Sequence, residues 1–164
     1  MADSHVQRII LAGGCFWGVQ YYLDQVPGIV ETVVGYTGGH TINPTYEQVC
    51  SHTTGHAEAV LVVFDPLVLP LEKLLQHFFR LHDPTQLNRQ GPDIGDSYRS
   101  AIFYLDEAQK PVAIAAMHEA AHELSEPIVT EITAASEFYV AEEYHQKFAE
   151  RTGRGMCHVP YKEL

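Results

Sequence analysis

A cysteine stands where a predicted strand gives way to a predicted helix. Cys15 follows Gly13 and Gly14, and it precedes two large aromatic residues, Phe16 and Trp17. Only the thiolate form of cysteine is a nucleophile, and the unpaired N–H groups in the first turn of a helix stabilise a thiolate. The two glycines allow a ligand to approach the backbone closely. This segment predicts a reactive thiol beside an apolar surface that suits a methyl group, although a buried, inert cysteine is the alternative.

Alternating strand and helix patterns surround this cysteine. Runs of branched apolar residues indicate buried strands, and apolar residues three and four apart indicate amphipathic helices. The predicted strands are 6–12, 29–36, 56–64, 99–105 and 128–133. The predicted helices are 15–24, 69–82, 106–124 and 141–151, with one helical turn at 45–50. Long loops cover 37–55 and 83–97, and loops of this length in compact domains are often functional.

The order of these elements predicts an α/β (α+β) fold in a single catalytic domain, residues 1–164. A βαββαβ order over 6–133 suits a ferredoxin-like plait, which is a two-layer sandwich with a mixed sheet covered by helices. The pattern alone also fits other two-layer folds. The end of the chain is rich in glycine, so we expect residues 152–164 to form an irregular, mobile C-terminal tail.

Composition excludes several classes of protein. The chain is 46% hydrophobic and 19% charged, which is not typical of a disordered protein. Its net charge of −11, without a basic run, argues against binding to nucleic acid. The apolar runs are too short to span a membrane, and the first residues do not resemble a secretory signal. Three cysteines do not suit a structural disulfide framework, so we expect a cytoplasmic protein with reduced thiols. We also expect a monomer.

Four blocks of sequence resemble the peptide methionine sulfoxide reductase A family. The blocks are GCFWG at 14–18, PTYEQVC at 44–50, TGHAEAV at 54–60, and HDPT at 82–85 with GPDIGDSYRS at 91–100. They occur in the order of the family, and the likeness covers about residues 7–150. The resemblance implies thiol-dependent reduction of methionine S-sulfoxide, free or in proteins, as repair of oxidative damage. It also implies that no cofactor is needed and that thioredoxin or a small dithiol is the reductant.

The resemblance further implies the roles of five residues. Cys15 would attack the sulfoxide sulfur, and Glu58 would protonate the sulfoxide oxygen. Tyr46 and Tyr98 would hydrogen-bond that oxygen, and Asp93 would assist them. These roles make chemical sense, because a leaving oxygen needs a proton and oriented hydroxyl groups. A carboxyl beside apolar rings has a raised pKa, and so it has a proton to give.

The remaining implied roles concern the pocket wall and the tail. Phe16 and Trp17 would hold the methyl group, and His145 would line the edge of the pocket, facing substrate or thioredoxin. Attack on the sulfoxide would leave a sulfenic acid on Cys15, which must be resolved. Cys157 in the tail would condense with Cys15 to a disulfide, which thioredoxin would then reduce.

Two other functions stay open at this point. His118, Glu119 and His122 match the His-Glu-x-x-His pattern of zinc proteases, so a metal-binding module is possible. An apolar stripe on the same predicted helix turns these residues toward solvent, which favours an ordinary solvated face. A cysteine hydrolase is the second alternative, but it requires a Cys–His pair, and the papain-type CGSCW pattern does not occur here.

Two residues near the second block have undecided roles. Cys50 ends the predicted helical turn, where a packing role is the more common one. It would resolve Cys15 only if Cys157 did not. His52 stands where many relatives carry glycine, and its effect on the loop is open.

Overall fold

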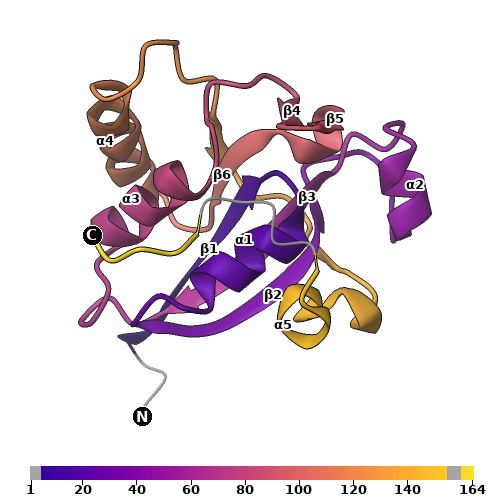
Figure 1. The fold of residues 1–164 in the computed structure, drawn as a ribbon, viewed down its shortest axis with the longest axis horizontal. Helices are drawn as coiled ribbons and strands as arrows, with labels where there is room; N and C mark the ends of the chain where they lie inside the picture. Colours follow the sequence, from indigo (N-terminus) through magenta and orange to yellow (C-terminus); the bar gives the residue numbers. More distant parts are fainter. Residues whose placement is uncertain (1–4, 155–159) are drawn as a thin grey trace.

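A computed structural model describes residues 5–154 and 160–164. In this part of the chain, six strands form one mixed sheet in the order β7-β6-β1-β3-β2-β8 (Figure 1). The antiparallel centre consists of β6 (Ser100–Tyr104), β1 (Gln7–Gly13), β3 (Ala57–Phe64) and β2 (Ile29–Thr37). At the edges, β7 (Glu131–Ala134) is parallel to β6, and β8 (Tyr139–Val140) is antiparallel to β2.

Two helices complete the predicted plait. The chain runs from β1 through α1 (Phe16–Leu23) to β2 and β3, and then through α3 (Leu71–Leu81) to β6. The sheet order β6-β1-β3-β2 is the order that a ferredoxin-like plait requires, so the predicted fold class is confirmed. A further helix, α4 (Gln109–Ala121), connects β6 to β7 along the chain and lies beside α3 (Figure 1).

The helices cover one face of the sheet. Successive side chains of a strand point to opposite faces, so Ile9 and Leu11 join the large core beneath the helices. Leu74 and Phe78 of α3 fill the same core and are fully buried. Complete burial of such a side chain stabilises the fold by roughly 1.5–3 kcal/mol.

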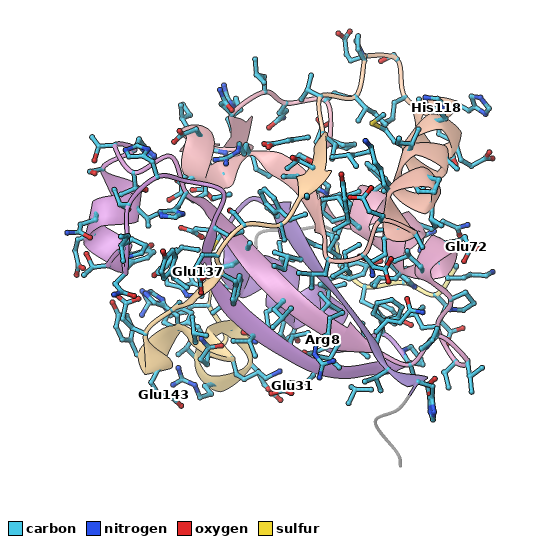
Figure 2. All side chains as sticks on the ribbon, turned by 180° about the vertical axis from the view of Figure 1, so that it is seen from behind. Arg8, Glu31, Glu72, His118, Glu137 and Glu143 are labelled. Carbon is cyan, nitrogen blue, oxygen red and sulfur yellow. The ribbon has the colours of Figure 1, made fainter. Side chains whose placement is uncertain are left out.

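The opposite face of the sheet is covered by an irregular segment that includes Phe138, rather than by helices. Ala12, Ala57, Ala59 and Ala101 belong to a second cluster there, and the segment between β7 and β8 crosses this face, in front of the sheet in Figure 2. A Cβ atom on Gly35 would lie 2.4 Å from the ring of Phe138, so glycine is required where that ring contacts the sheet.

One predicted helix is wrong. Residues 141–151 do not form a continuous helix: a 3-10 turn, η3 (Glu143–His145), precedes the short α5 (Phe148–Thr152). The reason is a long-range contact, in which the Gln146 side chain accepts from Val34 N–H and donates to Val34 C=O, each at 3.0 Å. Lys147 then adopts a φ of +59°, which separates the two turns.

The predicted loops contain additional structure. Within 83–97, β4 (Arg89–Gln90) and β5 (Asp93–Ile94) form a hairpin, followed by the 3-10 turn η2 (Asp96–Tyr98). The turn predicted at 45–50 is the short helix α2 (Tyr46–Cys50). The last residues, 160–164, are irregular, and the Tyr161 ring packs on Tyr22 and His77 of the helical layer. The mobility of the tail remains a prediction. No described helix is long and apolar enough to cross a membrane.

His77 makes the stability of this fold depend on pH. It is buried in α3, and its Nδ1 lies 2.9 Å from the hydroxyl of Tyr22. Burial, aided by the charge of Arg80, lowers the pKa of His77 from 6.5 to about 4. The unfolded chain therefore binds more protons than the folded chain below pH 6.5, and stability is lost as the pH falls from about 6.5 toward 4.

We expect His77 to account for a loss of about 3 kcal/mol of unfolding free energy across this interval. The measurement is urea unfolding at pH 7 and pH 4.5. The variant His77→Gln keeps a polar group for Tyr22 but does not titrate, so its stability should fall by less than that of the wild type. An equal fall in both proteins would contradict the assignment.

Candidate active site

Cys15 lies at the junction that the sequence predicts. β1 ends at Gly13, Gly14 adopts a φ of +97°, and α1 begins at Phe16 with Cys15 as its N-cap residue. The thiol is partly exposed, and the Cys15 carbonyl accepts the first helical bond from Val19 N–H at 3.3 Å. The thiol therefore lies at the positive end of a helix, where a thiolate is stabilised.

Glu58, which lies on β3, binds the first turn of α1. It is 1% exposed, and its Oε1 accepts a hydrogen bond from Phe16 N–H at 3.0 Å. Glu58 alternates along β3 with Ala57 and Ala59, so its side chain faces the helical layer while theirs face the opposite side. The carboxyl group is thereby held next to the residue that follows Cys15.

Tyr98 joins the site from η2. Burial raises its pKa far above the ordinary value, and Glu58, Cys50, Asp93 and Cys15 raise it further when they are charged. Tyr98 therefore keeps its proton at neutral pH and can donate a hydrogen bond. The fold thus places predicted residues from α1, β3, β5 and η2 within electrostatic reach of one hydroxyl group.

Tyr46 reaches the same site from the first turn of α2. Thr45 fixes the start of that helix, because its side chain accepts from Gln48 N–H at 3.2 Å in a capping box. Burial raises the pKa of Tyr46, and the neighbouring Glu58 and a hydrogen bond with Cys50 raise it as well. Tyr46 is accordingly a second protonated hydroxyl group beside the carboxyl.

An aromatic cluster forms one side of the site. The Tyr46 ring lies 6.4 Å from Phe16 and 6.2 Å from Trp17, measured between ring centres. Trp17 also stacks on Phe148 of α5 at 4.0 Å. The indole N–H of Trp17 donates to Nδ1 of His145 at 2.9 Å. The sequence places His145 at the pocket edge, whereas the structure buries it completely, in contact with Trp17.

Glu142 is a site neighbour that sequence reasoning missed. One carboxylate oxygen accepts from the Tyr36 hydroxyl at 2.7 Å, and the other accepts from Tyr46 N–H at 2.9 Å. Partial burial acts to raise the pKa of Glu142, but these hydrogen bonds outweigh it and lower the pKa. Nothing in the local sequence marks the contact of Glu142 with Tyr46.

The zinc-protease pattern does not form a site here. His118, Glu119 and His122 are exposed on or just after α4, and Figure 2 shows His118 at the outer side of that helix. Among residues 5–154 and 160–164, no three His, Cys, Asp or Glu side chains are grouped as metal ligands. The arrangement agrees with the solvated face that the sequence favours.

The remaining two cysteines of the chain are Cys50 and Cys157. Cys50 is partly buried between Tyr46 and Tyr98, and burial raises the pKa of its thiol although both tyrosines hydrogen-bond it. The sequence favours a packing role for Cys50, whereas the structure puts its thiol inside the site, next to both tyrosines. Cys157 lies outside the described residues.

Comparisons with known proteins agree with this site. Residues 7–164 match the family model for peptide methionine sulfoxide reductase. The peptide methionine sulfoxide reductase MsrA of Methanosarcina acetivorans is 53% identical over 150 residues, which cover 90% of this chain and 80% of that protein. This chain belongs to the peptide methionine sulfoxide reductase A family. It is therefore an enzyme that reduces methionine sulfoxide, as the resemblance predicts.

Solved structures of the family have the same fold. The reduced form of Mxr1 from Saccharomyces cerevisiae is similar with a TM-score of 0.91 and 34% identity, covering 97% of this chain and 94% of that one. Mxr1 in complex with Trx2 is similar with a TM-score of 0.68 and 26% identity, covering 97% of this chain and 92% of that one.

His52 connects the loop after α2 to the turn that carries Tyr98. Its Nδ1 lies 3.2 Å from Ser97 Oγ and 3.9 Å from a carboxylate oxygen of Asp96. The backbone of His52 has a φ of +61°, a left-handed conformation that strains any residue with a Cβ atom.

We expect His52→Gly to be more stable than His52→Ala by about 1 kcal/mol, because glycine relieves the backbone strain and alanine keeps it. Both variants lose the contact with Ser97, so their difference isolates the backbone. Urea unfolding of the two variants measures this difference. Equal stabilities would show that the left-handed conformation costs nothing at this position.

Proposed function

We propose that this enzyme reduces the S epimer of methionine sulfoxide, free and in proteins, through a sulfenic acid on Cys15. The observation that carries the proposal is the hydrogen bond between Glu58 and Phe16 N–H. It holds a buried carboxyl group beside the nucleophile, with the hydroxyl groups of Tyr46 and Tyr98 next to it.

The chemical step uses these groups together. The sulfur of Cys15 attacks the sulfoxide sulfur and forms an S–S bond, and the S–O bond breaks as the protonated oxygen leaves as water. A water molecule then attacks the Cys15 sulfur and breaks the S–S bond, which leaves a sulfenic acid on Cys15. Methionine is released as a sulfide, so the substrate is reduced by two electrons and the thiol is oxidised by two. Burial disfavours a charged carboxylate, so Glu58 is suited to donate the proton that the departing oxygen needs.

The tyrosines serve the same oxygen. Because the pKa values of Tyr46 and Tyr98 are raised, both hydroxyl groups stay protonated at neutral pH and can donate to the developing oxyanion. Asp93 contributes charge beside Tyr98 and would orient that hydroxyl. Phe16 and Trp17 would hold the methyl group of the substrate, since together with Tyr46 they form the apolar side of the site.

A second thiol must then remove the sulfenic acid. We propose that Cys157 attacks it, releasing water and forming a disulfide with Cys15, and that thioredoxin reduces the disulfide. The support for this partner is the similar yeast protein Mxr1, whose structure in complex with Trx2 is known. Cys50 is the alternative resolving thiol, because its sulfur lies inside the site. Cytoplasmic location and a monomeric state remain predictions.

The nucleophile is tested by Cys15→Ser. A serine hydroxyl keeps its proton at neutral pH, so we expect turnover of methionine sulfoxide with dithiothreitol to fall by roughly a thousandfold or more. Release of methionine, followed by chromatography, measures the rate, and Cys50→Ser is the matched control that should keep the first turnover. Most of the activity surviving in Cys15→Ser would mean that another group attacks the sulfoxide.

The resolving thiol is tested by Cys157→Ser. This variant should release about one methionine per enzyme in a single burst and then turn over little with thioredoxin. Mass spectrometry of the wild-type enzyme after one equivalent of sulfoxide should find Cys15 joined to Cys157. A disulfide between Cys15 and Cys50 would instead assign Cys50 as the resolving residue.

A further inference from the structure

His145 is built into the core beneath the indole of Trp17. Its side chain is 1% exposed, and its Nδ1 accepts the indole N–H at 2.9 Å. An accepting nitrogen carries no proton, so the neutral ring has its proton on Nε2, which lies 3.8 Å from Glu142 Oε1. Burial lowers the pKa of His145, which keeps the ring neutral and Nδ1 free to accept.

The same imidazole ring packs against the aromatic residues of the site. Its centre lies 4.4 Å from the ring of Tyr46, 5.3 Å from Phe16 and 5.6 Å from Trp17. His145 therefore contacts all three rings that the proposed function places around the methyl group, and like Phe16 it is 0% exposed. A change in the imidazole would shift the rings without removing a group that meets the substrate.

Glu142 binds two tyrosines next to these rings, Tyr46 and Tyr36. Its carboxylate accepts from the backbone N–H of Tyr46 and from the hydroxyl of Tyr36, at 2.9 and 2.7 Å. The Tyr36 ring packs 5.6 Å from Phe16, and Tyr36 pairs with Glu58 in the sheet. The carboxylate thus joins the first residue of α2 to the strand beside the proposed acid.

We propose that His145 and Glu142 are positioning residues that set the specificity of this enzyme for a methyl group on the sulfoxide sulfur. His145 fixes the angle of the Trp17 indole, and Glu142 fixes Tyr46 opposite to it. This assignment rests on the proposed function, in which those two rings border the methyl group. A fixed indole excludes a longer alkyl group, whereas an indole that can tilt admits one.

Two substitutions of His145 separate hydrogen bonding from volume. His145→Asn places a carbonyl oxygen near the position of Nδ1, so it can still accept from the indole. His145→Phe keeps a ring but leaves the buried indole N–H without this acceptor. We expect kcat/KM for methionine sulfoxide to fall about tenfold in His145→Phe, mainly through KM, and about threefold or less in His145→Asn.

The decisive readout is the choice between methionine sulfoxide and ethionine sulfoxide. The ratio of their kcat/KM values should move toward ethionine sulfoxide about fivefold or more in His145→Phe and stay near the wild-type ratio in His145→Asn. An unchanged ratio in His145→Phe overturns the proposal, even if the overall rate falls. Loss of the reaction itself is tested separately with Cys15→Ser, so the two proposals can fail independently.

Fluorescence follows the indole directly, because Trp17 is the one tryptophan in the chain. Acrylamide should quench the emission of His145→Phe about twofold more than that of the wild type, while His145→Asn should resemble the wild type. Equal quenching in all three folded proteins would show that His145 does not hold the indole. Circular dichroism identifies a variant that fails to fold; if His145→Phe does, His145→Leu, which also lacks an acceptor for the indole N–H, takes its place with the same expected results.

Glu142 has a matched control in its neighbour Glu143. The two carry the same charge, but Glu143 is exposed and lies at the outer edge of the molecule in Figure 2. Glu142→Ala should lower kcat about tenfold, Glu142→Gln should restore part of it because an amide oxygen can still accept from Tyr46 N–H, and Glu143→Ala should change little. Equal activities of Glu142→Ala and Glu143→Ala would exclude a positioning role for Glu142.

Discussion

The site depends on one hydrogen bond, from the backbone N–H of Phe16 to the carboxyl group of Glu58. The first N–H groups of any helix lack partners within it, and Cys15, the N-cap residue, makes no side-chain capping bond. β3 supplies the missing acceptor from 42 residues along the chain. The start of α1 therefore cannot shift along the sheet without leaving a buried polar group unpaired, which fixes Cys15 relative to Glu58.

The other side of α1 is fixed by buried polar side chains. Gln20 donates to the carbonyl of Thr32 in β2 at 3.2 Å, and its own carbonyl oxygen accepts from Lys147 N–H at 2.8 Å. Gln146 pairs with Val34 as another strand would. The segment around η3 thus binds both to the helix and to the edge of the sheet. This double attachment explains how residues late in the chain come to support Trp17 and Tyr46.

The sequence alone predicts most of this fold and much of the site, for identifiable reasons. Leu71, Leu74, Leu75 and Phe78 repeat at helical spacing, and the run of apolar residues in β3 indicates a buried strand; both signals are local. The family resemblance supplied Glu58, Tyr46 and Tyr98, which no periodicity would select. By contrast, the local pattern wrongly predicts one helix over 141–151, because the bonds of Gln146 to Val34 are not visible in it. Glu142 was missed for the same reason, since its partners lie on β2 and α2.

The bond between Trp17 and His145 joins residues 128 positions apart, and this separation has a consequence for biosynthesis. Chains are made from the N-terminus, and contacts between distant residues form late. A nascent chain that ends at β6 already contains Cys15, Glu58, Tyr46 and Tyr98, but it lacks the imidazole that supports the indole and the carboxylate that holds Tyr46. The apolar wall of the pocket is therefore completed only after the segment around η3 has been made.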